Sequence, residues 1–324
     1  MQTLKFYLVI FTLAGIALFV DVNFIHPRGG FLSVIDFYDD EELYDTIEVE
    51  TVAVEEIIEE EIVPVCSSES NGIDAVRDYL GRGSAPALEG KICVVQYFIN
   101  EHGDGWTDLE RKTATSRVHE AEAWLKDKAS EYGTDVDFTT VSYEKNYAID
   151  NLPTKYQEDN RNDKLLHKAF RSLNWTDHDA FVEHMKDKYD CDGVVLLVMV
   201  KGTGRSWACT YTRSDEEHGR TQDYAEGAII FNTKRFNNGT TAPLCAATVA
   251  HEILHLCGAW DFYEEEGIQD KEHADKAEQL FPKSIMLHEN KDIYNCEIDE
   301  VTAWLVGLNG RKNWYVWFQP EVKG

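Results

Sequence analysis

Three unbroken apolar runs of strand length constrain the fold of this chain more than any other feature. They occupy residues 91–100 (KICVVQYFIN), 193–201 (GVVLLVMVK) and 227–232 (GAIIFN). A strand that is apolar on both faces is typical of a sheet covered by helices on both sides, in which neighbouring strands run parallel. Segments with helical patterning separate the runs, as the crossover connections of parallel strands require. The sequence therefore predicts an α/β (α+β) fold with a mostly parallel, twisted sheet.

Two further segments complete a predicted sheet of five strands. Residues 136–143 (VDFTTVSY) alternate between apolar and polar side chains, and residues 206–213 (SWACTYTR) do the same. The second segment follows the short turn Gly202-Thr203-Gly204. Such a turn predicts a hairpin, and hence an antiparallel edge strand beside residues 193–201.

Helices are predicted between and after these strands. The first begins after Thr107-Asp108, covers residues 109–132 and stops at Gly133, since Ser, Thr and Asp favour helix starts and Gly favours helix ends. Further helical segments are predicted at 163–172, 179–189 and 241–256, with Pro243 in the first turn of the last one. Beyond residue 261 we expect a smaller, mainly irregular and helical lobe, with a helical excursion within 263–283 and a final strand at 313–318 (NWYVWF).

Charge divides the chain into a short acidic part and a longer body. The formal net charge of the 324 residues is −28, and residues 29–76 contain 15 acidic and no basic side chains. A polyanionic surface repels phosphates, which excludes nucleic acid as a partner. We expect residues 1–22 to be a signal anchor or signal peptide, 23–76 an acidic stalk or pro-segment, and 77–324 the folded body, with lobes meeting near residue 261. The oligomeric state stays open.

The N-terminus carries an apolar run at residues 6–20 (FYLVIFTLAGIALFV), between Lys5 and Asp21. Its 15 residues are few for a membrane-spanning helix and many for a signal-peptide core. Because no clean cleavage site follows, an uncleaved anchor is favoured over a signal peptide. Lys5 before the run places the N-terminus in the cytosol and the body outside, either anchored in the membrane or secreted.

One short motif carries metal chemistry. In His251-Glu252-Ile253-Leu254-His255, the two histidines are four residues apart and project from one face of a helix, so their imidazoles can hold one ion. Glu252 is rotated away from this pair but can reach a water on the metal, which is the position of a general base. Gly258 is suited to end the helix in a left-handed conformation, after which Asp261 can return as a third ligand.

His251-Glu-x-x-His255-x-x-Gly258-x-x-Asp261 resembles the signature of the metzincin clan of zinc endopeptidases, in its snapalysin-like form with Asp as third ligand. Ser284-Ile285-Met286 resembles the clan's Met-containing turn. The resemblance implies one catalytic Zn²⁺ held by His251, His255 and Asp261, with Glu252 as general base and a protein or peptide as substrate. It also implies that Met286 forms an apolar floor beneath the metal and that residues 298–308 form the clan's C-terminal helix.

The sequence departs from this pattern at one position, because His288 stands where astacin-like members have a Tyr that stabilises the transition state. His288 and Tyr294 are both candidates for that role. His273 is expected to be a surface residue, and Cys257 is expected either to pair with Cys296 or to be buried. A latency role for the Cys66 thiolate also stays open.

Two alternatives to an endopeptidase remain at this stage. The chain could be a zinc amidase that acts on cell-wall amide bonds, because the same metal chemistry serves both reactions. It could also be a non-proteolytic envelope adhesion or sensor module with a structural zinc site. An intact Glu252 favours catalysis, since a structural site needs no base.

Overall fold

The computed structural model describes residues 5–11, 17–25, 32–36, 84–152, 164–210, 225–236, 239–264, 269–288 and 291–318. The chain divides into two compact units, Met1–Ile62 and Val63–Gly324. Most of the predicted acidic stalk or pro-segment lies outside the described residues, and so does Cys66.

The first unit contains a three-stranded antiparallel sheet in the order β1-β2-β3, formed by Lys5–Phe11, Ala17–Ile25 and Leu32–Asp36. The apolar run 6–20, predicted to be an anchor helix or signal peptide, therefore has its described parts in two strands and not in a helix. Its Phe, Val and Ile side chains favour strands, which is the physical reason for the difference. In the described part of the chain, no helix is both long and apolar enough to cross a membrane. Membrane attachment stays a prediction.

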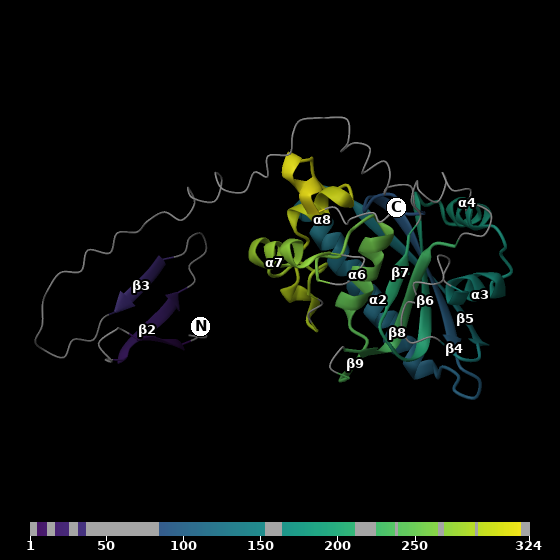
Figure 1. Cartoon of the computed structure of the whole chain (residues 1–324), viewed down its shortest axis with the longest axis horizontal. Helices are drawn as coiled ribbons and strands as arrows, with labels where there is room; N and C mark the ends of the chain where they lie inside the picture. Colours follow the sequence, from purple (N-terminus) through teal and green to yellow (C-terminus); the bar gives the residue numbers. More distant parts are fainter. Residues whose placement is uncertain are drawn as a thin grey trace, which may run out of the picture. The chain divides into compact units, whose positions relative to one another are not determined.

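The second unit is built on a mixed sheet in the order β5-β4-β6-β8-β7, shown in Figure 1. Three pairings, β4 with β5, β4 with β6 and β6 with β8, are parallel. This confirms the predicted α/β class and its mostly parallel sheet. The strands are β4 (Gly90–Asn100), β5 (Val136–Ala148), β6 (Gly193–Gly204), β7 (Trp207–Cys209), β8 (Gly227–Arg235) and β9 (Thr241–Pro243).

The edge of the sheet differs from the prediction in two ways. β7 is an antiparallel edge strand as expected, but it pairs with β8 and not with β6. The reason is that both sides of β6 are already occupied by the parallel strands β4 and β8. Residues Thr241–Pro243 form β9 against the end of β8, so the following helix starts at Ala246 and not near Thr241.

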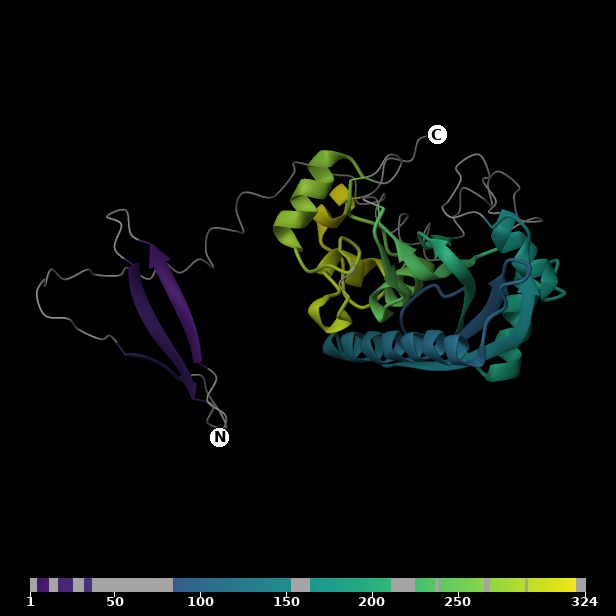
Figure 2. The same ribbon diagram turned by 90° about the horizontal axis from the view of Figure 1, so that it is seen from below.

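Helices cover both faces of the sheet (Figures 1 and 2). Alternate side chains of β4 and β6 point to opposite faces, as strand geometry requires. Val94 and Val195 belong to an apolar cluster with α2 (Asp108–Glu131) and α6 (Ala246–Leu256). Val95 and Val194 belong to a second cluster with α3 (Lys164–Ser172) and α4 (His178–Tyr189). The continuous apolar runs thus supply both cores.

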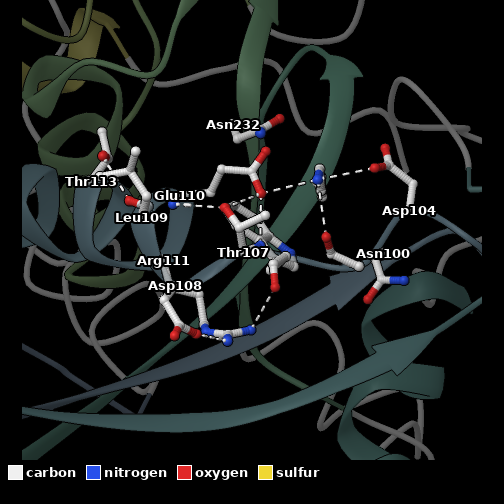
Figure 3. A network of polar contacts seen from close by, with 12 residues as sticks. Asn100, Asp104, Thr107, Asp108, Leu109, Glu110, Arg111, Thr113 and Asn232 are labelled. Atoms are coloured by element: carbon white, nitrogen blue, oxygen red, sulfur yellow. Dashed lines mark hydrogen bonds and ion pairs between the residues drawn. The ribbon is translucent and has the colours of Figure 1, made fainter.

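A polar network fixes the start of α2 against β6 (Figure 3). Thr107 caps the helix, and Glu110 completes a capping box by accepting from the Thr107 amide at 2.7 Å. The ammonium group of Lys201, from β6, donates to Gly105 O and to Glu110 Oε2, each at 3.0 Å, and pairs with Asp104. The predicted cap therefore also joins α2 to the sheet.

The C-terminal lobe gathers beside α6 and α2 (Figure 1). It contains α7 (Lys271–Leu280), η3 (Ile293–Asn295), α8 (Glu300–Leu305) and η4 (Asn313–Phe318). The strand predicted at 313–318 is wrong, because these residues form a 3₁₀ helix. In such a helix residues three apart lie on the same side, and this lets Tyr315 and Phe318 both be buried in the lobe.

Candidate metal centre

Helix α6 carries both histidines of the motif into the interior. Nearly all of its residues are buried, and it packs against α2, β7 and β8. His251 and His255 are four residues apart, so their rings lie on one face, with centroids 4.6 Å apart. The helix therefore presents two imidazoles side by side, as the spacing predicts.

The end of α6 turns the chain back toward this pair. Gly258 has φ of +104°, a backbone conformation that favours glycine. Its amide donates to His255 O at 2.9 Å, and the Ala259 amide donates to Leu254 O at 2.9 Å. Asp261 follows three residues after Gly258 and reaches the histidines. The predicted roles of Gly258 as helix stop and of Asp261 as the returning residue match this geometry.

Three atoms converge at the centre of the site. His251 Nε2 and His255 Nε2 are 3.1 Å apart, and Asp261 Oδ1 lies 3.1 Å from the first and 3.2 Å from the second. These three residues are the only group of three or more His, Cys, Asp or Glu side chains in the described part of the chain that is arranged to hold a metal ion. The structure thus brings the three sequence-predicted ligands together.

The hydrogen bonds of the two Nδ1 atoms determine which tautomer each imidazole adopts. His251 Nδ1 lies 3.0 Å from Ile285 O, and His255 Nδ1 lies 2.9 Å from Ala259 O. A carbonyl oxygen only accepts, so each Nδ1 carries the hydrogen and donates it. In the neutral imidazoles both Nε2 atoms are then bare acceptors, facing each other and a carboxylate oxygen. Three acceptors that converge in this way need a cation between them.

The donor set and its dimensions fit zinc. Two imidazole nitrogens and one carboxylate oxygen are ligands that zinc accepts, and such a set leaves a fourth position open. The three atoms lie 3.1–3.2 Å from one another, a spacing that would let one ion bind all three. Asp261 Oδ1 is buried and accepts no hydrogen bond, which leaves its lone pairs available to an ion.

The Asp261 carboxylate and the two imidazoles shift one another's pKa values. Burial by itself lowers the pKa of His255, but the Asp261 carboxylate outweighs it and the net pKa is raised. Burial by itself raises the pKa of Asp261, but the neighbouring imidazoles of His255 and His251 hold it well below its usual range. Asp261 is therefore ionised at neutral pH, as a metal ligand must be.

Tyr263 orients Asp261 from the side away from the histidines. Its hydroxyl donates to Asp261 Oδ2 at 2.9 Å, which leaves Oδ1 directed at the two imidazoles. Burial and the nearby carboxylate raise the pKa of this hydroxyl far above its usual range, so it keeps its proton. The Arg205 guanidinium lies 5.2 Å from the centre of the Tyr263 ring. Tyr263 was not predicted as a site residue, although its position two residues after Asp261 was a usable signal.

The turn that contains Met286 lies directly against the site. Its residue Ile285 supplies the carbonyl that receives the His251 Nδ1 hydrogen. Met286 is fully buried, and its carbonyl accepts from the Phe262 amide at 3.0 Å. The turn therefore holds one histidine and the residue after Asp261. The predicted position of the Met286 side chain beneath the metal stays a prediction.

Glu252 is buried next to the histidines. It is 2% exposed, and its charge contributes to the pKa values of both His255 and Tyr263. The Glu252 carboxylate is therefore near enough to His255 and Tyr263 for their charges to interact, and its role as general base stays a prediction.

Several other candidate residues lie elsewhere. His288 Nε2 is 2.5 Å from Glu278 Oε2 on the surface, and Tyr294 is 66% exposed. No hydrogen bond or ion pair among the described residues joins either side chain to the three converging residues. His273, expected to be a surface residue, is partly buried and stacks on Trp317 with ring centroids 4.1 Å apart.

The two cysteines proposed as a pair, Cys257 and Cys296, are both buried, and no disulfide joins them. Cys257 packs as a small apolar side chain in the cluster between the sheet and α6.

Comparisons with known proteins find similarity only at the level of solved structures. No protein-family model matches the chain, and no curated protein matches it. Among solved structures, metalloproteinase-II from Bacteroides fragilis is similar at a TM-score of 0.35 and 11% sequence identity, over 90% of this chain and 77% of that one.

Proposed function

We propose that this protein is a zinc-dependent endopeptidase. The observation that carries the proposal is the convergence of two hydrogen-free imidazole nitrogens and a buried carboxylate oxygen, all within 3.2 Å of one another. In a pair of buried histidines without a metal, each ring nitrogen normally donates or accepts a hydrogen bond with a neighbouring protein group. Here both donating nitrogens are already used by carbonyls, and the accepting nitrogens face one another.

In this proposal His251, His255 and Asp261 hold one zinc ion. When bound, the ion would polarise the substrate carbonyl and increase the acidity of a water. The backbone carbonyls of Ile285 and Ala259 hold the imidazole rings in the required tautomer, and Tyr263 holds the carboxylate. Outer contacts of this kind commonly change metal affinity or activity 10–100-fold.

Glu252 moves the proton. Its carboxylate accepts a proton from the attacking water and then delivers it to the nitrogen of the leaving amine. Because it is buried, the carboxylate is screened from bulk solvent and its charge acts strongly on nearby groups. No side chain of the protein forms a bond to the substrate in this sequence of steps.

The substrate and the location follow from the sequence. We propose a protein or peptide substrate, and an enzyme that is either membrane-anchored through its N-terminal apolar segment or secreted. The net charge of −28 is consistent with this, because it disfavours polyanionic substrates.

A cleavage assay on a peptide library, with the full-length zinc-loaded chain, tests the proposal. We expect Glu252→Gln to retain its zinc and to lose activity by a factor of about 10²–10⁴, the usual contribution of a general base. Glu297→Gln is the matched control, because this carboxylate is exposed and pairs with Lys283. It should leave the rate unchanged.

Two other outcomes of these assays would indicate a different function. Hydrolysis of a cell-wall amide but of no peptide would identify a zinc amidase. A wild-type chain that binds zinc and cleaves neither kind of bond would contradict catalysis and indicate a structural metal site.

A further inference from the structure

Two cysteines meet on the face of the sheet opposite the metal centre. Cys93 lies in β4, paired in register with Val194 of β6. Cys191 lies in the short connection from α4 to β6. The two thiols are near enough for each to affect the pKa of the other. Both belong to the apolar cluster that α3 and α4 form with the sheet, whereas the metal centre belongs to the cluster on the other face.

The connection that carries Cys191 is fixed to β4 at several points. Asp190 ends α4 in a left-handed conformation, with φ of 51°. The Asp192 amide donates to Lys91 O at 2.7 Å, and the Lys91 amide donates to Asp192 Oδ2 at 2.9 Å. Lys91 also forms an ion pair with Asp190 at 2.5 Å. These contacts lie on both sides of Cys191 and fix its backbone beside the start of β4, and its thiol donates to Met185 O at 3.7 Å.

Only one of the two thiols can be approached from solvent. Cys93 is fully buried, whereas Cys191 is partly exposed. Cys191 lines a hollow of about 540 Å³ whose other walls are charged side chains, among them Lys91, Lys186 and Asp187. A hollow of this size admits a small molecule, so a small oxidant can reach Cys191 first and Cys93 can react only through it.

We propose that Cys93 and Cys191 form a disulfide, with a small-molecule disulfide as the oxidant. The Cys191 thiolate attacks one sulfur of the small disulfide, whose S–S bond breaks and releases one small thiol. The Cys93 thiolate then attacks the Cys191 sulfur of this mixed disulfide and releases the second small thiol. Two cysteine thiols are oxidised, one small disulfide is reduced to two thiols, and the two cysteine protons end on those thiols.

The surroundings of the pair indicate a structural crosslink and not a redox catalyst. Burial raises the pKa of the Cys93 thiol to about 12, and burial also raises the pKa of Cys191. Catalytic thiols have lowered pKa values and exchange rapidly at neutral pH. A pair with raised pKa values exchanges slowly, so a disulfide formed here would persist. It would join the start of β4 to the start of β6.

Peptide mapping of the full-length chain tests the inference. The protein is equilibrated with excess oxidised glutathione at pH 8.5, quenched in acid, denatured, alkylated and digested. We expect the peptide linked through Cys93 and Cys191 to exceed any other cysteine-linked peptide at least tenfold. The same link should form in Cys209→Ala, whose substituted thiol is also partly exposed, and should be absent in Cys191→Ala.

Recovery of both cysteines as alkylated or glutathione-capped residues in the wild type would overturn the inference, and so would preferential linkage of either one to another cysteine. Because the readout is a covalent link in the wild-type chain, it does not depend on whether a variant folds. It is also independent of zinc and of peptidase activity.

Discussion

The hydroxyl of Ser284 donates to the buried carboxylate of Asp299 at 2.6 Å, and this bond joins the turn that carries Met286 to the start of α8. Asp299 also caps α8, because it accepts from the amides of Val301 and Thr302 at 2.9 Å each and from the Thr302 hydroxyl at 2.6 Å. One carboxylate therefore fixes both the helix and the turn whose carbonyl orients His251.

Replacing Asp299 by Ala should destabilise the protein strongly. The change removes a helix cap and leaves buried hydroxyl donors without their acceptor, which together should cost about 2–4 kcal/mol of unfolding free energy. Chemical denaturation followed by circular dichroism measures this. Glu297→Ala, at an exposed ion pair nearby, should change the unfolding free energy by less than about 0.5 kcal/mol. Equal losses in the two variants would refute the role given to Asp299.

Tyr263→Phe should weaken metal binding and leave the fold intact. The phenyl ring is kept, but Asp261 Oδ2 loses the hydrogen bond from the Tyr263 hydroxyl, at 2.9 Å, so the carboxylate is less firmly oriented. Loss of an outer contact of this kind predicts a 10–100-fold lower zinc affinity, measured by competition with a chromogenic chelator. Tyr294→Phe, at an exposed position, is the matched control. Unchanged affinity in Tyr263→Phe would show that Asp261 is oriented without the hydroxyl.

Gly258→Ala should disturb the return of Asp261 to the site. A Cβ atom is strongly disfavoured at φ of +104°, so we expect a loss of about 1–3 kcal/mol in unfolding free energy and a lower zinc affinity. Gly310→Ala is a suitable control, because an added Cβ there meets no atom within 4 Å and its φ is not positive. A fully stable Gly258→Ala variant with normal zinc content would contradict the proposed role of this turn.

Acid should weaken the attachment of α2 to β6. The Thr107 amide, followed by the Lys201 ammonium, lowers the pKa of Glu110 to about 2. A lowered folded-state pKa contributes stability above the unfolded-state value of about 4.3, and this stability is lost as the pH falls toward 2. Because Glu110 lies near solvent, the effect should be on the order of 1 kcal/mol. Unfolding titrations between pH 5 and 2 should show a shallower pH dependence for Glu110→Gln; an identical dependence would contradict this account.

Much of the fold follows from local sequence patterns. The apolar runs ending at Asn100 and Lys201 predict buried strands, and Thr107 and Gly133 mark the limits of α2 closely. The pairing of β7 with β8 could not be predicted from a local sequence pattern. The turn at Gly202 indicates only that the chain reverses, whereas the partner of β7 depends on which strand edges are already occupied.

The site was predictable where spacing along one helix determines proximity, as for His251 and His255. The contacts that orient these ligands could not be predicted from the sequence. The acceptors of the Nδ1 hydrogens are the backbone carbonyls of Ile285 and Ala259, and any residue type supplies such a group. Asp299 lies 15 residues from Ser284 in the sequence, so its contact depends on the path of the lobe.

The zinc content of the purified chain is the sharpest test of the metal site assigned to His251, His255 and Asp261. The full-length chain is loaded with zinc, freed of excess ion by gel filtration and analysed by mass spectrometry of the metal. The account predicts one zinc ion per chain in the wild type and in His273→Ala, and a loss of nearly all zinc in Asp261→Ala and His255→Ala. A wild-type chain that holds no zinc at neutral pH, or an Asp261→Ala variant that holds as much as the wild type, would contradict it.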